Sequence, residues 1–310
     1  MNNEINRAAE LLKAGKLVAF PTETVYGLGA NALSDAAVAA IYAVKNRPEF
    51  NPLIVHIHSV EASKKFVQWD ERAEKLAAKF WPAPLTFVLP RKKDCGLSLL
   101  VSAGLDCVAV RMPSHPVALE LLEKSGLPLA APSANRSGRI SPTLAEHVRE
   151  ELGDKLAMII DGGACAVGIE STILDLTVTP ATILRHGKIT REELENYIEI
   201  GDSNTGEIKA AGMLKSHYAP KSKVRLNATE VRAGEALLAF GKPLAGQGEN
   251  LSENLSSGEN LEEAAANLFR MLRLLDAKNP SAIAVQPIPN YGLGVAINDR
   301  LNRAAADRTA

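Results

Sequence analysis

The chain has 310 residues, of which 46% are hydrophobic, and its formal net charge is −1. This length suits two domains, and the hydrophobic fraction is sufficient for a packed core. Basic and acidic residues are balanced on both sides of residue 200, with 22 against 24 before it and 13 against 12 after it. Because a protein that binds nucleic acid through a broad basic surface normally carries excess positive charge, the composition argues against that class.

The apolar segments and the cysteines of the sequence also indicate the cellular compartment. No segment approaches the roughly 18 consecutive apolar residues of a membrane-spanning helix, and residues 1–16 have the pattern of an amphipathic helix rather than of a signal peptide. The three cysteines, Cys95, Cys107 and Cys165, are far apart. This spacing fits a reducing compartment and supports neither a zinc site nor a disulfide framework, so we expect a cytoplasmic protein.

The first predicted unit is a strand, a polar loop, a helix and a second strand. The apolar run 17–20 predicts a buried strand, and the glycine-containing loop 22–29 follows it. A helix capped by Ser34 or its neighbour ends before Pro48, because the residue preceding a proline is disfavoured in helical conformation. Residues 53–58 form the second strand and complete a βαβ-like unit.

The rest of the first domain alternates strands with helices. Further strands are predicted at 86–90, 108–113, 128–131, 158–161, 171–176 and 181–185, and helices at 60–80, 115–125, 141–152 and 191–197. In the third of these helices, Ser141 is placed as the N-cap and Pro142 as the first residue. Several connections are too short for helical crossovers, so we predict an α/β fold with a mixed sheet.

A change of composition ends this domain near residue 200. The following segment is polar and aperiodic and predicts a linker, whose HYAP sequence at 217–220 either packs the linker down or covers a site. A small α/β domain then begins, in which residues 249–261 repeat Glu-Asn-Leu three times and predict an exposed loop. The predicted parts are 1–200, 201–223 and 224–310, with strands at 236–240 and 282–285 and helices at 261–275 and 296–308 in the last part.

Several familiar chemistries lack their motifs. The sequence contains no P-loop, no GxGxxG after the first strand and no GxSxG nucleophile elbow. His56 and His58 alternate along one strand with the spacing of two metal ligands, but no third ligand stands at a recognisable spacing, so we expect no metal site built from side chains. Lys45 and Arg47 could be a solvated helix terminus, where cations meet the helix dipole.

A set of polar side chains at separate strand and helix ends is the alternative to that solvated terminus. Four cations with several hydroxyls and amides suit a highly anionic small ligand, because arginine is a planar fork of donors and lysine a point charge. None of them is an obvious nucleophile. The set comprises Thr24, Lys45, Arg47, Asn51, His56, Arg111, Ser133, Asn135, Ser171 and Arg185.

Five motifs in order resemble the YrdC-like threonylcarbamoyl-AMP synthases: FPTETVYGLG, KNRP followed by NPL, VAVRMP, PSAN and the glycine-flanked ESTILD. The linker HYAP and the tail GLGVAINDRLNRAA resemble the longer, two-domain branch. The resemblance implies a YrdC-like mixed twisted sheet with helices and a smaller Rossmann-like C-terminal domain. It further implies a nucleotidyltransferase that uses L-threonine, bicarbonate and ATP, with Mg²⁺, to make threonylcarbamoyl-AMP and pyrophosphate. Separate transferase machinery would then modify tRNA with the product.

The resemblance also implies roles for individual residues. Thr24, His56, Arg111 and Ser171 would hold threonine. Lys45 and Arg47 would act in catalysis and, together with Asn51, Ser133, Asn135, Ser141 and Arg185, would hold the nucleotide, over which Tyr218 would fold. Cys107 departs from the family pattern, which often has a threonine contacting the nucleotide there. Because a thiol is a weak donor, a backbone contact must serve at that position or affinity is reduced.

Two other functions stay open at this point. The same cations could line an RNA groove in a module without adenylate synthesis, although balanced charge and an aromatic content of 5% give such a groove little support. A carbamoyltransferase of related fold would use carbamoyl phosphate, but that subfamily normally carries acylphosphatase-like and zinc-finger modules. This sequence shows neither of those modules.

Overall fold

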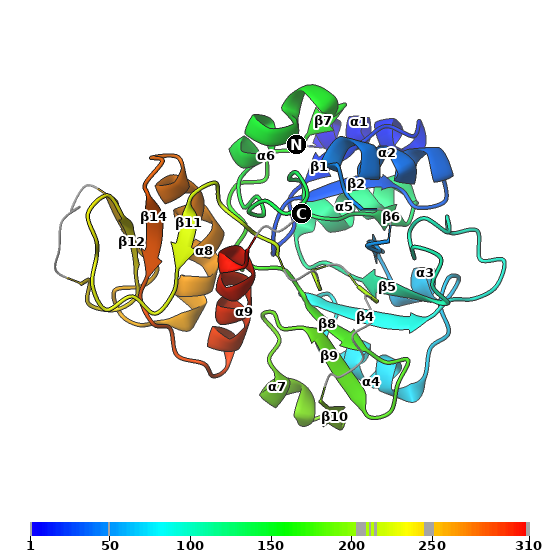
Figure 1. Cartoon of the computed structure of the whole chain (residues 1–310). Coiled ribbons are helices and arrows are strands. Elements are labelled where there is room, and N and C mark those ends of the chain that lie inside the picture. The colour runs from blue at the N-terminus through cyan, green and yellow to red at the C-terminus, as the bar shows by residue number, and fades with distance from the viewer. Residues whose placement is uncertain are drawn as a thin grey trace.

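The computed structural model describes residues 2–48, 50–202, 209–210, 212–213, 216–244 and 251–307. Within these residues the chain forms a ten-stranded sheet and a separate four-stranded sheet (Figure 1). The large sheet has the order β10-β9-β8-β4-β5-β3-β6-β2-β1-β7. Its strands are β1 (Val18–Phe20), β2 (Gly27–Asn31), β3 (Ile54–His56), β4 (Leu85–Pro90), β5 (Cys107–Arg111), β6 (Leu129–Ala130), β7 (Met158–Ile159), β8 (Thr172–Asp175), β9 (Ala181–Arg185) and β10 (Ile200–Gly201).

The large sheet is mixed, as predicted. The pairs β1–β7, β3–β5, β4–β8 and β9–β10 are parallel, whereas β1–β2, β2–β6, β3–β6, β4–β5 and β8–β9 are antiparallel. Parallel neighbours need long crossovers and antiparallel ones do not, which accounts for the short connections in the sequence. The arrangement brings the end of β3 next to the end of β5, with His56 opposite Arg111.

Helices cover both faces of this sheet. Val18 and Phe20 of β1 face a cluster with α1 and α5, whereas Ala19 between them faces the main core with α2, α4 and α6, as expected from the alternation of side chains along a strand. The helices of this part are α1 (Asn2–Lys13), α2 (Asp35–Lys45), α3 (Val60–Ser63), α4 (Glu71–Phe80), α5 (Pro116–Ser125), α6 (Ala145–Leu152) and α7 (Arg191–Glu195). In the described part of the chain, no helix has both the length and the apolar character needed to cross a membrane.

Three local predictions are wrong. Part of the predicted loop 22–29 is strand β2, where Gly29 runs so close to Phe20 that a Cβ would lie 2.8 Å from the ring. The predicted helix 60–80 is broken, because Asp70 caps a new helix by accepting from the Ala73 N–H. Helix α6 begins only at Ala145, since the Ser141 hydroxyl bonds to another loop instead of capping.

The second sheet is entirely parallel, in the order β11-β14-β12-β13, and this confirms the small α/β domain. Residues 251–261 contradict the exposed-loop prediction, because they include a strand and the buried Leu255, while 249–250 lie outside the described residues. The elements are β11 (Lys223–Arg225), β12 (Ala236–Ala239), β13 (Ser252–Asn254), β14 (Ala282–Val285), α8 (Leu261–Asp276) and α9 (Leu293–Ala305).

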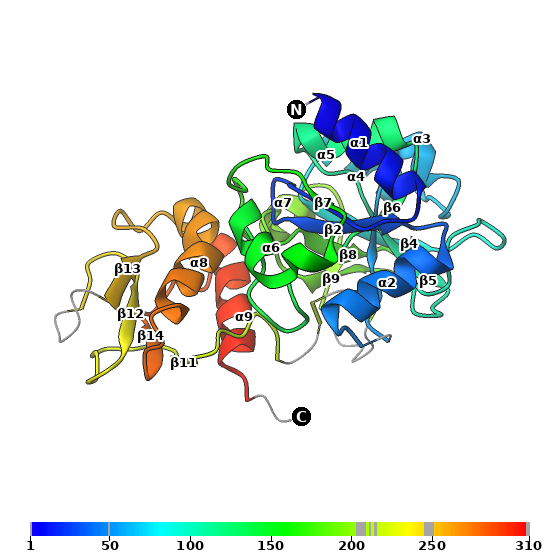
Figure 2. The ribbon, with the colours of Figure 1, turned by 90° about the horizontal axis from the view of Figure 1, so that it is seen from above.

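Helices α8 and α9 lie between this smaller sheet and the rest of the chain (Figures 1 and 2). Their apolar faces form a cluster that also contains Val25, Ile140 and Ile169 from the larger part. Gly168 lets the backbone pass against α8, because a Cβ there would lie 2.5 Å from backbone atoms of Ala266. The two parts therefore share one packed interface rather than a loose hinge.

Candidate active site

A small cavity lies where the ends of β3, β5 and β9 meet the segment 217–218. Its volume is about 40 Å³, much less than the several hundred Å³ of a typical ligand pocket. Seven of the predicted site residues line it: Thr24, Arg47, His56, Arg111, Ser133, Arg185 and Tyr218. Of the other five, Lys45, Asn51, Ser141 and Ser171 each lie one hydrogen bond from a lining residue or its backbone. Asn135 lies one bond further out, since its backbone oxygen accepts from Lys45. The structure thus brings the whole predicted set together.

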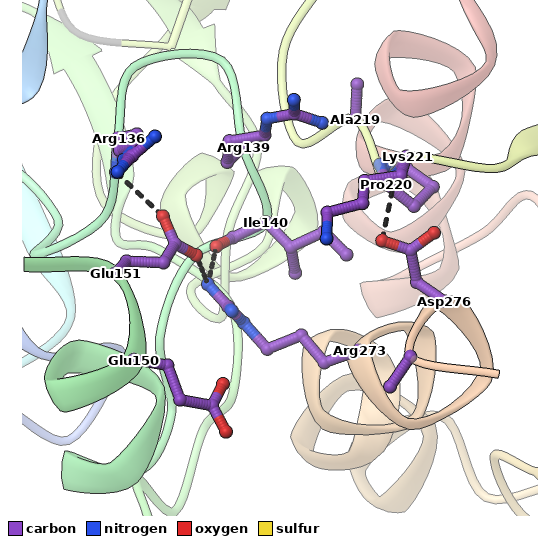
Figure 3. A pocket seen from close by; sticks show the side chains of 11 residues that line it. Arg136, Arg139, Ile140, Glu150, Glu151, Ala219, Pro220, Lys221, Arg273 and Asp276 are labelled. Carbon is purple, nitrogen blue, oxygen red and sulfur yellow. Dashed lines mark hydrogen bonds and ion pairs between the residues drawn. The ribbon is translucent and has the colours of Figure 1, made fainter. Parts of the chain in front are cut away.

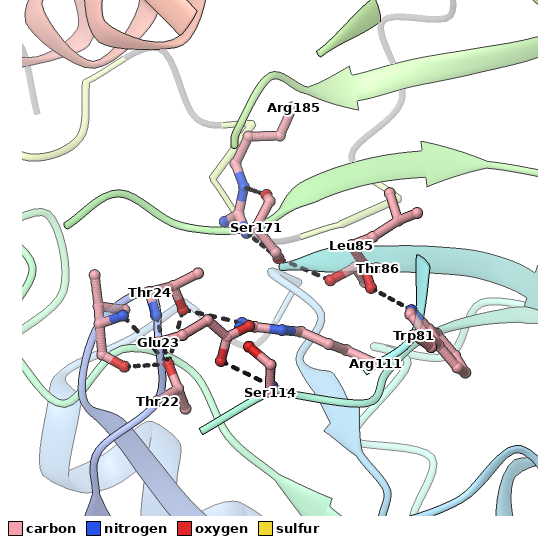
Figure 4. Close-up of polar contacts among 11 residues, drawn as sticks. Thr22, Glu23, Thr24, Trp81, Leu85, Thr86, Arg111, Ser114, Ser171 and Arg185 are labelled. Carbon is pink, nitrogen blue, oxygen red and sulfur yellow. Dashed lines mark hydrogen bonds and ion pairs between the residues drawn. The ribbon is translucent and has the colours of Figure 1, made fainter. Parts of the chain in front are cut away.

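Arg111 is the centre of the polar contacts at one end of the cavity (Figure 4). Its guanidinium donates to Thr24 Oγ1 at 3.1 Å and to Glu23 Oε1 at 2.5 Å. Glu23 also accepts from the backbone N–H of Ser114, which fixes its carboxylate. Nε of Arg111 is buried and has no hydrogen-bond partner among the described residues. Arg111 is therefore held rigidly by its own chain and keeps its Nε donor unused.

His56 lies beside Arg111 and is uncharged. Burial, with the positive charge of Arg111, lowers the pKa of its imidazole to about 3. Its Nδ1 lies 3.3 Å from the backbone oxygen of Ile54. Because a carbonyl oxygen only accepts, this contact assigns the proton to Nδ1 and leaves Nε2 as an acceptor. The ring can accept from a ligand hydroxyl or ammonium without adding charge to the site.

Arg185 enters the cavity from β9 and is braced by Ser171. Its Nε and Nη2 donate to the backbone oxygen and the hydroxyl of Ser171 at 3.0 and 3.1 Å. The Ser171 hydroxyl lies 2.8 Å from that of Thr86 in the neighbouring strand β4 (Figure 4). Burial lowers the pKa of Arg185, but a guanidinium stays charged at neutral pH.

Lys45 and Arg47 are buried, with relative exposures of only 1% and 7%. The alternative of a solvated helix terminus at these residues is therefore wrong. Lys45 Nζ donates to the backbone oxygens of Ser133 and Asn135, and it thereby ties the PSAN loop to α2. Burial and the nearby Arg47 lower the pKa of Lys45, and burial lowers that of Arg47 to about 10. Arg47 donates to the backbone oxygen of Asn51 at 3.1 Å and of Pro52 at 2.9 Å.

A wider cavity of about 370 Å³ lies between α6, α8 and residues 219–221 (Figure 3). None of the predicted site residues lines it. Arg273 of α8 donates there to Glu151 and to the backbone oxygen of Ile140, and Asp276 accepts from the backbone N–H of Lys221. These contacts of Arg273 and Asp276 join the two parts of the chain across this cavity. Because the predicted site residues line the smaller cavity instead, that cavity is the better candidate for chemistry.

Both parts of the chain match known families. Residues 10–187 match the Sua5/YciO/YrdC family, described as telomere recombination, and residues 189–306 match the family described as threonylcarbamoyl-AMP synthase, C-terminal domain. The threonylcarbamoyl-AMP synthases of Pyrococcus abyssi and Bacillus subtilis are 42% and 40% identical to this chain, over 98% of it and over 95% and 94% of their own lengths. The chain belongs to the threonylcarbamoyl-AMP synthase family.

Solved structures agree with this membership. The crystal structure of P. abyssi Sua5 complexed with L-threonine matches with a TM-score of 0.88 at 41% identity, over 97% of this chain and 94% of that one. Escherichia coli YciO matches with a TM-score of 0.54 at 23% identity, over 60% of this chain and 90% of that one, which is a likeness of fold alone. The YrdC-like mixed sheet with a smaller C-terminal α/β domain is thereby confirmed.

Some residues of this synthase's cavity were not predicted. Glu170, His217, Thr22, Val25 and Gly212 also line it. Glu170 stands within the motif ESTILD, but an acidic residue gives no signal for an anionic ligand. Cys107, by contrast, begins β5 at the end opposite Arg111 and is not among the lining residues.

Two asparagines of the synthase keep unused polar atoms. The side-chain oxygen and nitrogen of Asn51, and Oδ1 of Asn135, are buried without hydrogen-bond partners among the described residues. Buried polar groups are usually paired, so such atoms mark places for ligand or water. Within the same residues, no group of three or more His, Cys, Asp or Glu side chains could hold a metal ion.

The free energy of unfolding is expected to fall as the pH drops from about 6.5 towards 4, partly through His147. Burial and the charges of Arg273 and Arg270 lower the pKa of His147 to about 4. Between these pH values the unfolded chain binds a proton that the folded chain does not, so stability falls with pH by up to about 1.4 kcal/mol per unit. His147→Asn keeps an acceptor for the Thr143 N–H and should flatten the pH dependence of urea unfolding. An unchanged slope would contradict the lowered pKa.

Proposed function

We propose that this synthase makes threonylcarbamoyl-AMP and pyrophosphate from L-threonine, bicarbonate and ATP. It is an enzyme, a nucleotidyltransferase, and threonine and ATP are its substrates. Its product supplies the threonylcarbamoyl group that separate transferase machinery places on the adenosine beside the tRNA anticodon. A cytoplasmic location fits this role, and the wide separation of the three cysteines in the sequence is in keeping with a reducing compartment.

The grouping of the twelve predicted residues, seven lining one cavity and five behind its lining, supports this proposal most strongly. Arg47, Arg111 and Arg185 all line it, so its charge suits two anions, a carboxylate and a polyphosphate. Few aromatic side chains lie there for base stacking along a strand, and the volume is too small for a polynucleotide groove. An RNA-binding module without synthesis therefore has less support.

Threonine is assigned to the end of the cavity formed by Arg111, Thr24, His56 and Ser171. The unused Nε of Arg111 would donate to the threonine carboxylate, and Nε2 of His56 would accept from its hydroxyl. The amine is then directed towards bicarbonate, with which it forms a carbamate and water. A carbamate oxygen attacks the α-phosphorus of ATP, a new P–O bond forms, and pyrophosphate leaves with the electrons of the broken bond.

The nucleotide is assigned to the cations and amides at the other end: Lys45, Arg47, Asn51, Ser133, Asn135, Ser141 and Arg185. This displacement needs positioning and charge neutralisation rather than a protein nucleophile. Binding of phosphate would raise the lowered pKa of Lys45 again. Lys45 and Arg47 therefore act as the catalytic pair, since they offset the charge that grows on the leaving pyrophosphate.

Mg²⁺ bound with ATP fits the residues present. This ion is held mainly by substrate phosphates and water, with few protein ligands. The unpaired amide oxygens of Asn51 and Asn135 would face its hydration shell. When bound it would supply further neutralisation of the phosphates.

We propose the division into a catalytic domain (1–200), a linker that covers the active site (201–223) and a small C-terminal domain (224–310). Tyr218 and His217 line the cavity, and each is 6% exposed or less. Parts of the linker, residues 203–208, 211 and 214–215, lie outside the described residues. Because the cavity holds only about 40 Å³, the segment with His217 and Tyr218 must move aside to admit ATP. Once closed again over the substrates, it would exclude water from the carbamate and the mixed anhydride.

The proposed reaction is tested by pyrophosphate release with ATP and Mg²⁺ while threonine or bicarbonate is omitted in turn. Release that requires both, with the adenylate detected by mass spectrometry, supports it. Release that depends on neither, or no release from a folded sample, would leave the family membership without this activity. RNA binding would then be measured as a function of salt.

ATP and threonine together are expected to raise the melting temperature of the protein by more than either alone. A ligand that binds only the folded state stabilises it by RT ln(1 + [L]/Kd), about 2.7 kcal/mol at one hundred times Kd. For this measurement ATP is replaced by an analogue with a methylene group between the α- and β-phosphorus atoms, which prevents turnover because that is the bond the reaction breaks. Protection by RNA but not by this pair would favour the RNA-binding alternative.

A further inference from the structure

Arg300 is a fully buried cation in α9, the last helix of the chain. Its relative exposure is 0%. Nε donates to Glu170 Oε2 at 3.1 Å, and Nη1 donates to the backbone oxygen of His186 at 2.6 Å and to Asp299 Oδ2 at 3.1 Å. Glu170 and His186 belong to the larger part of the chain, so this side chain crosses the interface. A guanidinium is costly to desolvate, and such complete burial calls for a reason.

Glu170 connects this cation to the active-site cavity. It precedes β8, is 6% exposed and lines the cavity. Its other oxygen, Oε1, accepts from the hydroxyl of Ser141 at 2.5 Å. Arg300, Glu170 and Ser141 therefore form an unbroken chain of contacts from the second domain to a proposed nucleotide contact.

The charge of Glu170 must be balanced if ATP is to bind beside it. Like charges repel strongly in a buried site, because the effective dielectric constant is low. Burial by itself would raise the pKa of Glu170, but the charges of Arg300 and Arg185 and the hydrogen bond from Ser141 together outweigh burial and hold that pKa below its usual value. The carboxylate thus stays ionised, and Arg300 is bonded to it directly.

Helix α9 also contacts the pair of residues that closes the cavity. The guanidinium carbon of Arg300 lies 5.6 Å from the centre of the Tyr218 ring, within the range of a cation–π interaction. The backbone N–H of His217 donates to the backbone oxygen of Arg303 at 3.3 Å, and the Tyr218 ring stacks on Phe269 of α8. Arg300 therefore contacts both the Glu170 carboxylate and the Tyr218 ring.

We propose that Arg300 is a positioning residue of the nucleotide site, supplied by the second domain, which neutralises Glu170 and so fixes Ser141 for ATP. This inference rests on the proposed function, since it assigns the neighbouring site to ATP. It gives the C-terminal domain a direct part in substrate binding. The domain balances the charge of Glu170 from behind the cavity, whose lining comes from the catalytic domain and the linker.

Arg300→Met in the full chain tests the proposal by steady-state kinetics. With its counter-ion removed, Glu170 would repel the triphosphate, and the KM for ATP is expected to rise about tenfold or more while kcat changes less. Glu170→Gln in the same protein removes the uncompensated charge but keeps an acceptor for Ser141. The double variant is therefore expected to return the KM for ATP to within about threefold of the wild type.

Rescue by the second substitution is what a merely structural role would not produce. If Arg300 only held the domains together, both variants would contain less active protein and would show an unchanged KM for ATP. That outcome would overturn the proposal. Lys188→Met is the matched control, because Lys188 forms an exposed ion pair with Glu262 across the same interface without contacting the cavity. Its KM for ATP is expected to stay at the wild-type value.

Two further measurements keep the test decisive. If Arg300→Met does not fold, Glu170→Gln alone is used, and a KM for ATP that is unchanged or lower supports the charge argument while a tenfold rise contradicts it. The dissociation constant of ATP is measured by calorimetry in parallel. A wild-type protein that binds ATP but makes no adenylate would contradict the proposed function, whereas tighter ATP binding by wild type than by Arg300→Met would still support this inference.

Discussion

Arg47→Ala is expected to reduce pyrophosphate release by about 10²–10³-fold while the protein stays folded. Arg47 lines the cavity and is 7% exposed. Its guanidinium is held by the backbone oxygens of Asn51 and Pro52, so it is oriented before substrate arrives. Donors fixed in advance at the place where charge develops lower the barrier without reorganisation, and alanine removes them.

The loss should appear mainly in kcat, because the charge that Arg47 offsets grows in the transition state. Arg47→Lys keeps the charge but not the planar fork, and it should recover only part of the rate. Arg149→Ala is the control, since Arg149 of α6 forms exposed ion pairs with Glu146 and Asp161, and its loss should leave turnover unchanged. Near-normal rates from folded Arg47→Ala protein would show that the phosphate assignment is wrong.

Patterns within a few residues predicted local structure well. Helix α2 begins after Ser34, whose hydroxyl accepts from the Ala37 N–H, and ends at Asn46 in left-handed conformation before Pro48. Such caps depend only on neighbours in the chain, so one sequence suffices to find them. The mixed sheet also followed from connection lengths.

Failures arose where a distant residue decides the local outcome. Ser141 has the spacing of an N-cap, yet its hydroxyl donates to Glu170, which lies 29 positions further along. The strand β2 contains two glycines and looks like a loop, but its close approach to Phe20 leaves no room for a Cβ at Gly29. Neither partner can be read from the local pattern, because tertiary contacts override propensity.

In the candidate site, too, local patterns were readable from the sequence whereas distant partners were not. Cations and hydroxyls at strand ends were visible as a set that suits anions, and sheet topology then brought His56 opposite Arg111. Glu170 was not found, because its counter-ion Arg300 is 130 positions away and no periodicity links them. An acidic residue in an anion site becomes understandable only when the partner that neutralises it is seen.

Arg111→Lys is expected to raise the KM for threonine by about two orders of magnitude and to leave ATP binding nearly unchanged. Lysine keeps the charge but cannot reproduce a fork that meets Thr24, Glu23 and a ligand carboxylate at once. Alanine is a poorer test at this position. It would leave the buried Glu23 carboxylate without its partner, which typically costs about 3–5 kcal/mol of stability.

The threonine dependence of pyrophosphate release at saturating ATP measures this effect. Arg225→Lys is the matched control, because Arg225 also forms a forked ion pair, with Glu235, but does so in the second domain away from the cavity. Its KM for threonine should equal that of the wild type. The variant Arg111→Met with Glu23→Gln removes both charges, so it should fold yet bind threonine poorly. If Arg111→Lys bound threonine as tightly as the wild type, a group other than Arg111 would hold the threonine carboxylate. The unused Nε of Arg111 would then have to serve a different ligand.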